Sequence, residues 1–404
     1  MKYVVILADG MADEKIKELG DKTPLDYAYT PHLEKLAPYS IIGAVKTIPE
    51  GCPKGSDTAN LAVLGYNPEK YYFGRSPLEA LSIGVELQES DVTFRVNLVT
   101  LSEEEEYQDK RIIDYSADEI TTEEADVLIK AVAEELGDAW HKFYTGISYR
   151  HLLVWREGSA KVRLMPPHDI LGKTIKDHKP CGANEEEIWQ LMIRSYEILS
   201  KHPLNISRKE RGLKPANSMW IWGEGTKPQF PIFKEKYGLD GAVISAVDLI
   251  KGIGIGIGMK SIDVPGVTGT VHTNYEGKVK AAIWWLIDQD KDFVYIHLEG
   301  PDECGHRAEL DNKIKAIEYI DEKIIGPVIE ALQQAGLDYK LMVLPDHPTP
   351  VRLRTHTGDK VPFIIYDSQQ MNIINAYNTY NEEYANHSEY QIDEGYTLMD
   401  KFLT

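Results

Sequence analysis

Three stretches near the C-terminus bring together carboxylates and imidazoles. They are PDECGH with Asp302 and His306, LPDHP with Asp346 and His347, and RTHT with His356. Carboxylate oxygens and imidazole nitrogens are ligands that suit manganese, zinc or magnesium. Two acids and three histidines are enough to hold two such ions. Asp302 and His306 are four residues apart, so on a helical turn they share one face.

Two of these stretches follow apolar runs that read as buried strands, at 292–298 and 340–344. Parallel strands buried on both faces have this composition, and open α/β sheets place their sites at the carboxyl ends of such strands. An Asp after a strand can also be only a helix cap, and a lone histidine can be a core residue. The coincidence of five such residues favours a metal site.

The N-terminus repeats this pattern, because the apolar run 3–8 ends at Asp9. Asp9 is either a turn residue or a further metal ligand. A Pro- and Gly-rich loop then leads to a predicted helix that starts at Ser56. Ser56 is a helix cap or, next to a dipositive ion, an activated nucleophile. A helix N-terminus also suits phosphate, and the metal-binding residues downstream favour the nucleophile.

Composition limits the classes of partner. The 404 residues carry a net charge of −20, which disfavours non-specific binding to nucleic acid or to an anionic membrane. The spacing of the three cysteines fits neither a disulfide framework nor a zinc knuckle, which indicates a reducing cytoplasm. The opening MKYVVILADG is too short for a signal peptide, and no apolar run approaches the ~20 residues that span a bilayer. We therefore expect a cytoplasmic protein.

The order of predicted elements indicates an α/β fold with an insertion. Residues 1–87 and 178–404 are predicted to form a discontinuous domain with a mostly parallel sheet flanked by helices. Residues 88–177 are predicted to form a smaller α+β cap domain. A buried strand at 219–222 is assigned to the larger domain, as is one long helix at 311–334. The run GIGIGIGM lacks the strand–GxGxxG–helix context of a dinucleotide site, so glycine packing at a helix end explains it better.

Several motifs together resemble a known family across essentially the whole chain. They are ILADGMAD, GSDTANLAVLGY, GRSPLEA, SYRHLLVW, ISAVDLIKGIG, PDECGH, LPDHPTP and THTGDKVPF. The sequence resembles the cofactor-independent phosphoglycerate mutases of the archaeal type, in the alkaline phosphatase superfamily. It looks closest to a bacterial branch proposed to act as homoserine kinases.

The resemblance implies a glycolytic isomerase that interconverts 3-phosphoglycerate and 2-phosphoglycerate without a bisphosphoglycerate cofactor. It implies two divalent metal ions and a transient phosphoserine at Ser56. The ligands it assigns to one ion are Asp9, Ser56, Asp346 and His347. Those it assigns to the other ion are Asp302, His306 and His356.

The sequence departs from the family pattern at two places. Asn60 stands where the mutases carry a histidine, and Asp118 and Glu119 stand near the position of an archaeal arginine. These acids could instead meet the ammonium group of homoserine. The candidate substrate-binding residues are Asn60, Arg75, Arg95, Arg150 and Lys251.

Three other functions stay open at this point. They are a homoserine kinase-like phosphotransferase, a metal-dependent phosphomonoesterase and a metal-binding protein without activity. Mutase chemistry on a small phosphorylated substrate is the preferred prediction. The oligomeric state is left open.

Overall fold

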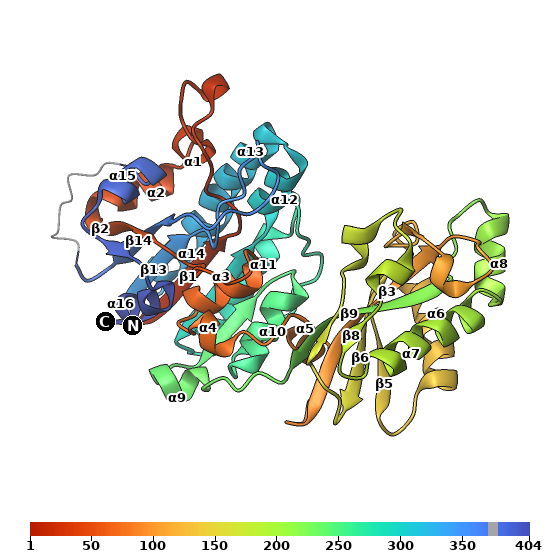
Figure 1. Ribbon diagram of the computed structural model, residues 1–404. Helices are drawn as coiled ribbons and strands as arrows, with labels where there is room; N and C mark the ends of the chain where they lie inside the picture. Colours follow the sequence, from red (N-terminus) through yellow and green to blue (C-terminus); the bar gives the residue numbers. More distant parts are fainter. Residues whose placement is uncertain (371–378) are drawn as a thin grey trace. The chain divides into compact units, whose positions relative to one another are not determined.

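The computed structural model describes residues 1–370 and 379–404. The chain divides into two compact units (Figure 1). Met1–Tyr72 and Gln229–Thr404 form the first, here called the sheet unit. Phe73–Pro228 form the second, here called the insert unit.

An eight-stranded sheet forms the centre of the sheet unit. In spatial order its strands are β11 (Lys260–Ser261), β10 (Gly241–Ile244), β12 (Phe293–Leu298), β1 (Lys2–Ala8), β13 (Tyr339–Leu344), β14 (Val361–Asp367), β2 (Ser40–Val45) and β15 (Gln391–Ile392). Only β14 runs antiparallel to its neighbours, β13 and β2. The prediction of a mostly parallel sheet is therefore confirmed, with the first strand of the chain near its middle.

Helices cover both faces of this sheet (Figure 1). Val4 and Ile6 of β1 belong to one large core cluster that includes side chains from α2 (Pro31–Leu36) and α11 (Tyr275–Ile283). The alternate side chains of β1 face the other way, and the Tyr3 ring meets the Phe402 ring of α16 (Leu398–Leu403) at 5.7 Å. Strands buried on both faces read as continuous apolar runs, which explains the sequence KYVVILA.

The predicted helix at 311–334 is interrupted by a π-helical turn. It consists of α13 (Leu310–Ile320), η7 (Asp321–Ile325) and α14 (Gly326–Gln334). The turn directs the buried Asp321 carboxylate at the start of α2, where it accepts the backbone N–H groups of His32 and Leu33 at 3.0 and 2.8 Å. A side chain distant in sequence thus satisfies the free N–H groups at this helix end.

The insert unit has its own core. Its sheet has the order β4 (Ile112–Asp114), β3 (Asp91–Leu101), β6 (Arg150–Arg156) and β5 (His141–Ile147), and β9 (Ser218–Thr226) also pairs with β3. α6 (Thr122–Leu136) and α7 (Glu185–Leu199) pack against this sheet and contribute to one apolar cluster. Thr121 caps α6 as its sequence predicts, since its hydroxyl accepts from the backbone N–H of Glu124.

The insert unit extends beyond the predicted 88–177 on both sides. β9, expected in the larger domain, pairs with β3 from Val92 to Val99. The sequence identifies a buried strand there but contains no local signal of which sheet it joins, because pairing is a long-range interaction. α7 packs against β9 and therefore also belongs to the insert unit.

The other α-helices and strands of the described residues complete the two units. They are α1 (Pro24–Tyr27), α3 (Ser56–Val63), α4 (Pro68–Tyr71), α5 (Ser76–Ser82), α8 (Pro203–Glu210), α9 (Phe233–Tyr237), α10 (Asp248–Gly256), α12 (Gly300–Arg307), α15 (Glu382–His387), β7 (Val162–Arg163) and β8 (Cys181–Gly182). The glycine–isoleucine run forms α10, where a Cβ on Gly254 would lie 2.4 Å from a Val243 methyl carbon. Glycine therefore permits close helix–strand packing. Within the described residues, no helix has the length and apolar character needed to cross a bilayer.

Candidate functional site

The predicted ligands gather at the carboxyl ends of three adjacent strands. β1 lies between β12 and β13 and runs parallel to both. Asp9 directly follows β1, α12 with Asp302 follows β12, and Asp346 lies two residues beyond β13. The sheet thus brings together residues that are up to 337 positions apart, at the edge where α/β sheets bind ligands.

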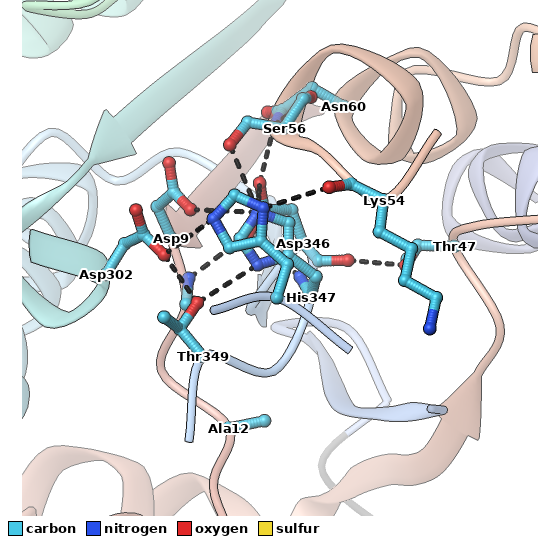
Figure 2. A network of polar contacts seen from close by, with 12 residues as sticks. Asp9, Ala12, Thr47, Lys54, Ser56, Asn60, Asp302, Asp346, His347 and Thr349 are labelled. Carbon is cyan, nitrogen blue, oxygen red and sulfur yellow. Dashed lines mark hydrogen bonds and ion pairs between the residues drawn. The ribbon is translucent and has the colours of Figure 1, made fainter. Parts of the chain in front are cut away.

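Asp9, Asp346 and His347 form a buried set, here called the inner group. Each offers a ligand atom within 4.8 Å of the others, and none is more than 2% exposed. His347 Nε2 lies 3.4 Å from Asp346 Oδ2 and 3.6 Å from Asp9 Oδ1. Figure 2 shows these side chains converging below Ser56.

Neighbouring groups fix the Asp346 carboxylate. Its Oδ1 accepts the backbone N–H groups of Gly10 and His347 at 3.1 and 2.9 Å, and its Oδ2 accepts from Asn60 Nδ2 at 2.9 Å. Asn60 is fully buried, and its own carbonyl accepts from the Tyr295 hydroxyl at 2.6 Å. The Asn60 amide thus holds a candidate ligand, and its part in substrate binding stays a prediction.

The buried Asp9 carboxylate indicates whether the inner group fits a metal ion. Burial, reinforced by the nearby Asp346 carboxylate, raises the pKa of Asp9 well above its ordinary value. Asp9 Oδ1 is buried and forms no hydrogen bond. Two buried carboxylates beside a neutral imidazole are costly unless a cation lies between them. The inner group fits a divalent metal ion.

Asp302, His306 and His356 form a second, more accessible set, here called the outer group. The Nε2 atoms of the two histidines lie 2.9 Å apart and 3.3 and 3.4 Å from the Asp302 oxygens. Asp302, His347 and His356 also have ligand atoms within 4.8 Å of one another. His347 is therefore within reach of both groups, and the geometry alone does not assign it to one ion.

The hydrogen bonds of the three histidines define which nitrogen is available. His306 Nδ1 lies 3.0 Å from the Arg354 carbonyl and His356 Nδ1 lies 3.0 Å from the Lys54 carbonyl, so both must donate. Thr349 donates its hydroxyl to Asp302, so its oxygen accepts from His347 Nδ1 at 3.2 Å. In the neutral rings every Nε2 then carries a lone pair directed at the carboxylates. A metal ion would satisfy these Nε2 lone pairs. Histidines that bind a metal ion typically donate their other ring N–H to a carbonyl or carboxylate, as these Nδ1 atoms do.

Ser56 lies beside this cluster. It is the first residue of α3, and Gly55 occupies the N-cap position. Ser56 Oγ lies 3.1 Å from His347 Nε2 (Figure 2). The cap interpretation of Ser56 is excluded, and its hydroxyl faces the nitrogen that is free to bind a metal ion.

The candidate cations are divided between the two units. Arg75, Arg95 and Arg150 lie in the insert unit and Lys251 in the sheet unit. Arg95 pairs with Glu79 at 3.0 Å, and its guanidinium lies 4.5 Å from the Trp222 ring centre. Arg75 stands half-buried at the start of α5, Arg150 is exposed, and Lys251 pairs with Asp263 at 2.9 Å. Their part in substrate binding stays a prediction.

Sequence reasoning missed several residues that support the ligands. His297 in β12 contacts Asp9, Tyr295 in the same strand holds Asn60, and Thr349 bridges Asp302 and His347. Histidine and tyrosine within an apolar run resemble ordinary core residues. The only available signal was that His297 falls near a strand end next to a predicted ligand stretch.

The chain was compared with known proteins at the level of sequence and fold. The family profile described as 2,3-bisphosphoglycerate-independent phosphoglycerate mutase matches residues 37–205, and that of type I phosphodiesterase / nucleotide pyrophosphatase matches residues 169–397. A probable 2,3-bisphosphoglycerate-independent phosphoglycerate mutase of Geobacter sulfurreducens is 47% identical over 100% of both chains. The Methanosarcina barkeri mutase of that name is 48% identical over 91% of this chain and 90% of its own.

Solved structures agree with this. A Pyrococcus horikoshii protein has a TM-score of 0.82 at 29% identity, covering 100% of this chain and 96% of its own. The cofactor-independent phosphoglycerate mutase of Thermoplasma acidophilum has a TM-score of 0.69 at 26% identity, covering 100% of this chain and 99% of its own.

Sequence and fold together show that this protein is a phosphotransferase. Within that class the chain belongs to the 2,3-bisphosphoglycerate-independent phosphoglycerate mutase family.

Proposed function

We propose that this protein interconverts 3-phosphoglycerate and 2-phosphoglycerate through a phosphoserine at Ser56, with two divalent metal ions. Asp9, Ser56, Asp346 and His347 would hold one ion. Asp302, His306 and His356 would hold the other. The observation that carries this proposal is the position of Ser56 Oγ, 3.1 Å from a histidine nitrogen that lies 3.4 and 3.6 Å from the Asp346 and Asp9 carboxylates.

The metal ions would supply a lowered pKa for the bound hydroxyl and polarisation of the phosphoryl group. The Ser56 hydroxyl loses its proton and its Oγ attacks phosphorus, the P–O bond to the glycerate breaks, and the released glycerate oxygen takes up a proton. The glycerate then presents its other hydroxyl, which attacks the phosphoserine, loses its proton and frees Ser56. Ser56 is the first residue of α3, so the positive end of this helix dipole would lie next to the phosphoryl charge.

The kinase alternative gains no support from Asp118, one of the two acids that could meet the ammonium group of homoserine. Asp118 is bound by Lys214 through Nζ at 3.0 Å and through the backbone N–H at 2.7 Å. The glycine-rich run that superficially suggests a nucleotide loop lies in α10. Simple hydrolysis would use the same cluster with water as the acceptor, so an assay must separate it from transfer.

The test compares Ser56→Ala with Ser82→Ala, whose hydroxyl bonds only to the carbonyl of Glu79 in its own helix. Each manganese-loaded protein is given 3-phosphoglycerate, an aryl phosphate, or homoserine with ATP. We expect 2-phosphoglycerate from the wild type and from Ser82→Ala, and none from Ser56→Ala. Full turnover by Ser56→Ala, or formation of phosphohomoserine without 2-phosphoglycerate, would overturn the proposal.

A cytoplasmic location stays a prediction that accords with Cys52, Cys181 and Cys304, which form no disulfide in the structure.

A further inference from the structure

A chain of hydrogen bonds links the interior of the sheet to Asp9. His297 Nε2 lies 3.0 Å from Asp9 Oδ2, and His297 Nδ1 lies 3.1 Å from Ser245 Oγ. Ser245 Oγ also accepts the backbone N–H of Val247 at 2.9 Å. Ser245, His297 and Asp9 are each at most 2% exposed, so water does not compete for these contacts.

Three neighbouring strands build this chain. β12 lies between β10 and β1, with Ile296 opposite Ile244 and His297 opposite Leu7. Ser245 therefore follows β10 at the level of His297, and Asp9 follows β1 two residues beyond Leu7. The buried Lys278 amine donates to the backbone carbonyl of His297 and fixes the histidine from α11.

The partners determine where the imidazole carries its proton. When Asp9 binds a metal ion it is ionised and can only accept, so the 3.0 Å contact then places the proton on His297 Nε2. His297 Nδ1 then holds a lone pair and must accept from the Ser245 hydroxyl.

This arrangement gives the two carboxylate oxygens of Asp9 different surroundings. Oδ2 is occupied by His297, whereas Oδ1 is buried without a hydrogen bond and faces His347 Nε2 at 3.6 Å. We propose that Ser245 and His297 are positioning residues that leave Asp9 a single oxygen for the metal ion, and that they thereby disfavour calcium. This inference rests on the metal site of the proposed function.

The selectivity follows from ligand number. Calcium takes 6–8 oxygen ligands and accepts two-oxygen carboxylates in flexible geometry, whereas smaller divalent ions need fewer ligands. An Asp9 restricted to one oxygen contributes less to a calcium site. If Oδ2 were released, the carboxylate could turn and offer both oxygens. Partners of metal ligands typically contribute 10–100-fold in metal affinity.

The test measures manganese and calcium affinities of the full-length protein by titration calorimetry, with folding checked by circular dichroism. His297→Leu removes the donor to Asp9, whereas His297→Gln keeps an N–H donor of similar reach. Ser245→Ala removes the group that orients the ring and perturbs packing less than a change at His297. The control is His151→Leu, because His151 is also buried and neutral but lies in the insert unit.

We expect His297→Leu to bind manganese 10–100-fold more weakly and to raise the ratio of calcium to manganese affinity at least about threefold. Ser245→Ala should shift the manganese affinity and the calcium-to-manganese ratio in the same directions. His297→Gln should retain most of the manganese affinity, and His151→Leu should match the wild type. Unchanged affinities in both His297→Leu and Ser245→Ala, or His297→Gln as weak as His297→Leu, would overturn the inference. A wild type that binds no manganese would instead refute the metal site of the proposed function.

Discussion

The inner and outer groups hold similar ligands in different ways. Asp9, Asp346 and His347 are at most 2% exposed, whereas the side chains of His306 and His356 are 36% and 17% exposed. The inner carboxylates accept hydrogen bonds from the sheet and from α3, while each outer histidine is held at Nδ1 by one backbone carbonyl. The inner group is thus preorganised by the fold, and the outer group depends more on the metal ion for its geometry.

Among the variants considered, Asp346→Ala is expected to have the largest effect, because it disrupts the inner group directly. It removes a ligand and the acceptor of Gly10, His347 and Asn60 at once. We expect loss of mutase turnover on the order of a thousandfold or more, with loss of the inner ion. An activity assay measures the turnover, and mass spectrometry measures the number of metal ions per chain. Retention of two ions per chain would contradict a role for Asp346 as a ligand.

His306→Ala tests the outer group alone. Because His306 contacts only Asp302, His356 and a backbone carbonyl, we expect its loss to weaken the outer ion about 100-fold and to leave the inner ion bound. Metal content should fall from two ions to one under dilute metal. Simultaneous loss of both ions would show that the two groups bind as one unit.

Asn60→Ala tests the support of the inner group. The buried Tyr295 hydroxyl would lose its acceptor, and Asp346 would lose a donor, so we expect about 1–3 kcal/mol of destabilisation. Thermal unfolding without metal measures this. Tyr295→Phe is the control, since the double variant should lose less than the sum of the two single changes. Strict additivity would mean that the two side chains do not cooperate.

The smallest expected effect is a pH dependence of the outer group. The hydrogen bond to Asp302 raises the pKa of His306 to about 9 in the metal-free protein. Its stabilising contribution is then complete below the unfolded value of ~6.5 and is lost as the pH rises through about 9. A metal ion must displace this proton, so manganese affinity should rise between these pH values. His306→Ala should flatten that rise, and a pH-independent wild type would contradict it.

The sequence was most informative where chemistry follows strand ends. Asp9, Asp302 and Asp346 could be placed together because each follows a buried parallel strand, and such strands end at one edge. Ser56 was recognised from its loop and the helix that follows it. Local patterns of this kind are visible without knowing the fold.

The missed features depend on long-range contacts. The hydrogen bond from Asn60 to Asp346 was not foreseen, because it depends on how α3 packs against the end of β13. His297 was unmarked because its role depends on the neighbouring strands β10 and β1. β9 was assigned to the wrong unit because nothing in its own residues specifies β3 as its partner.

The position of β1 in the sheet also has a consequence for biosynthesis. β1 is made long before its two partners, β12 and β13, which begin at Phe293 and Tyr339. At roughly 5–20 residues per second, the apolar segment KYVVILA waits about 15–60 s for its first neighbour on the ribosome. The insert unit can complete its own core in that interval, since all of its strands lie between Phe73 and Pro228. We therefore expect the apolar segment of β1 to be the part of the chain that needs protection by a chaperone during synthesis.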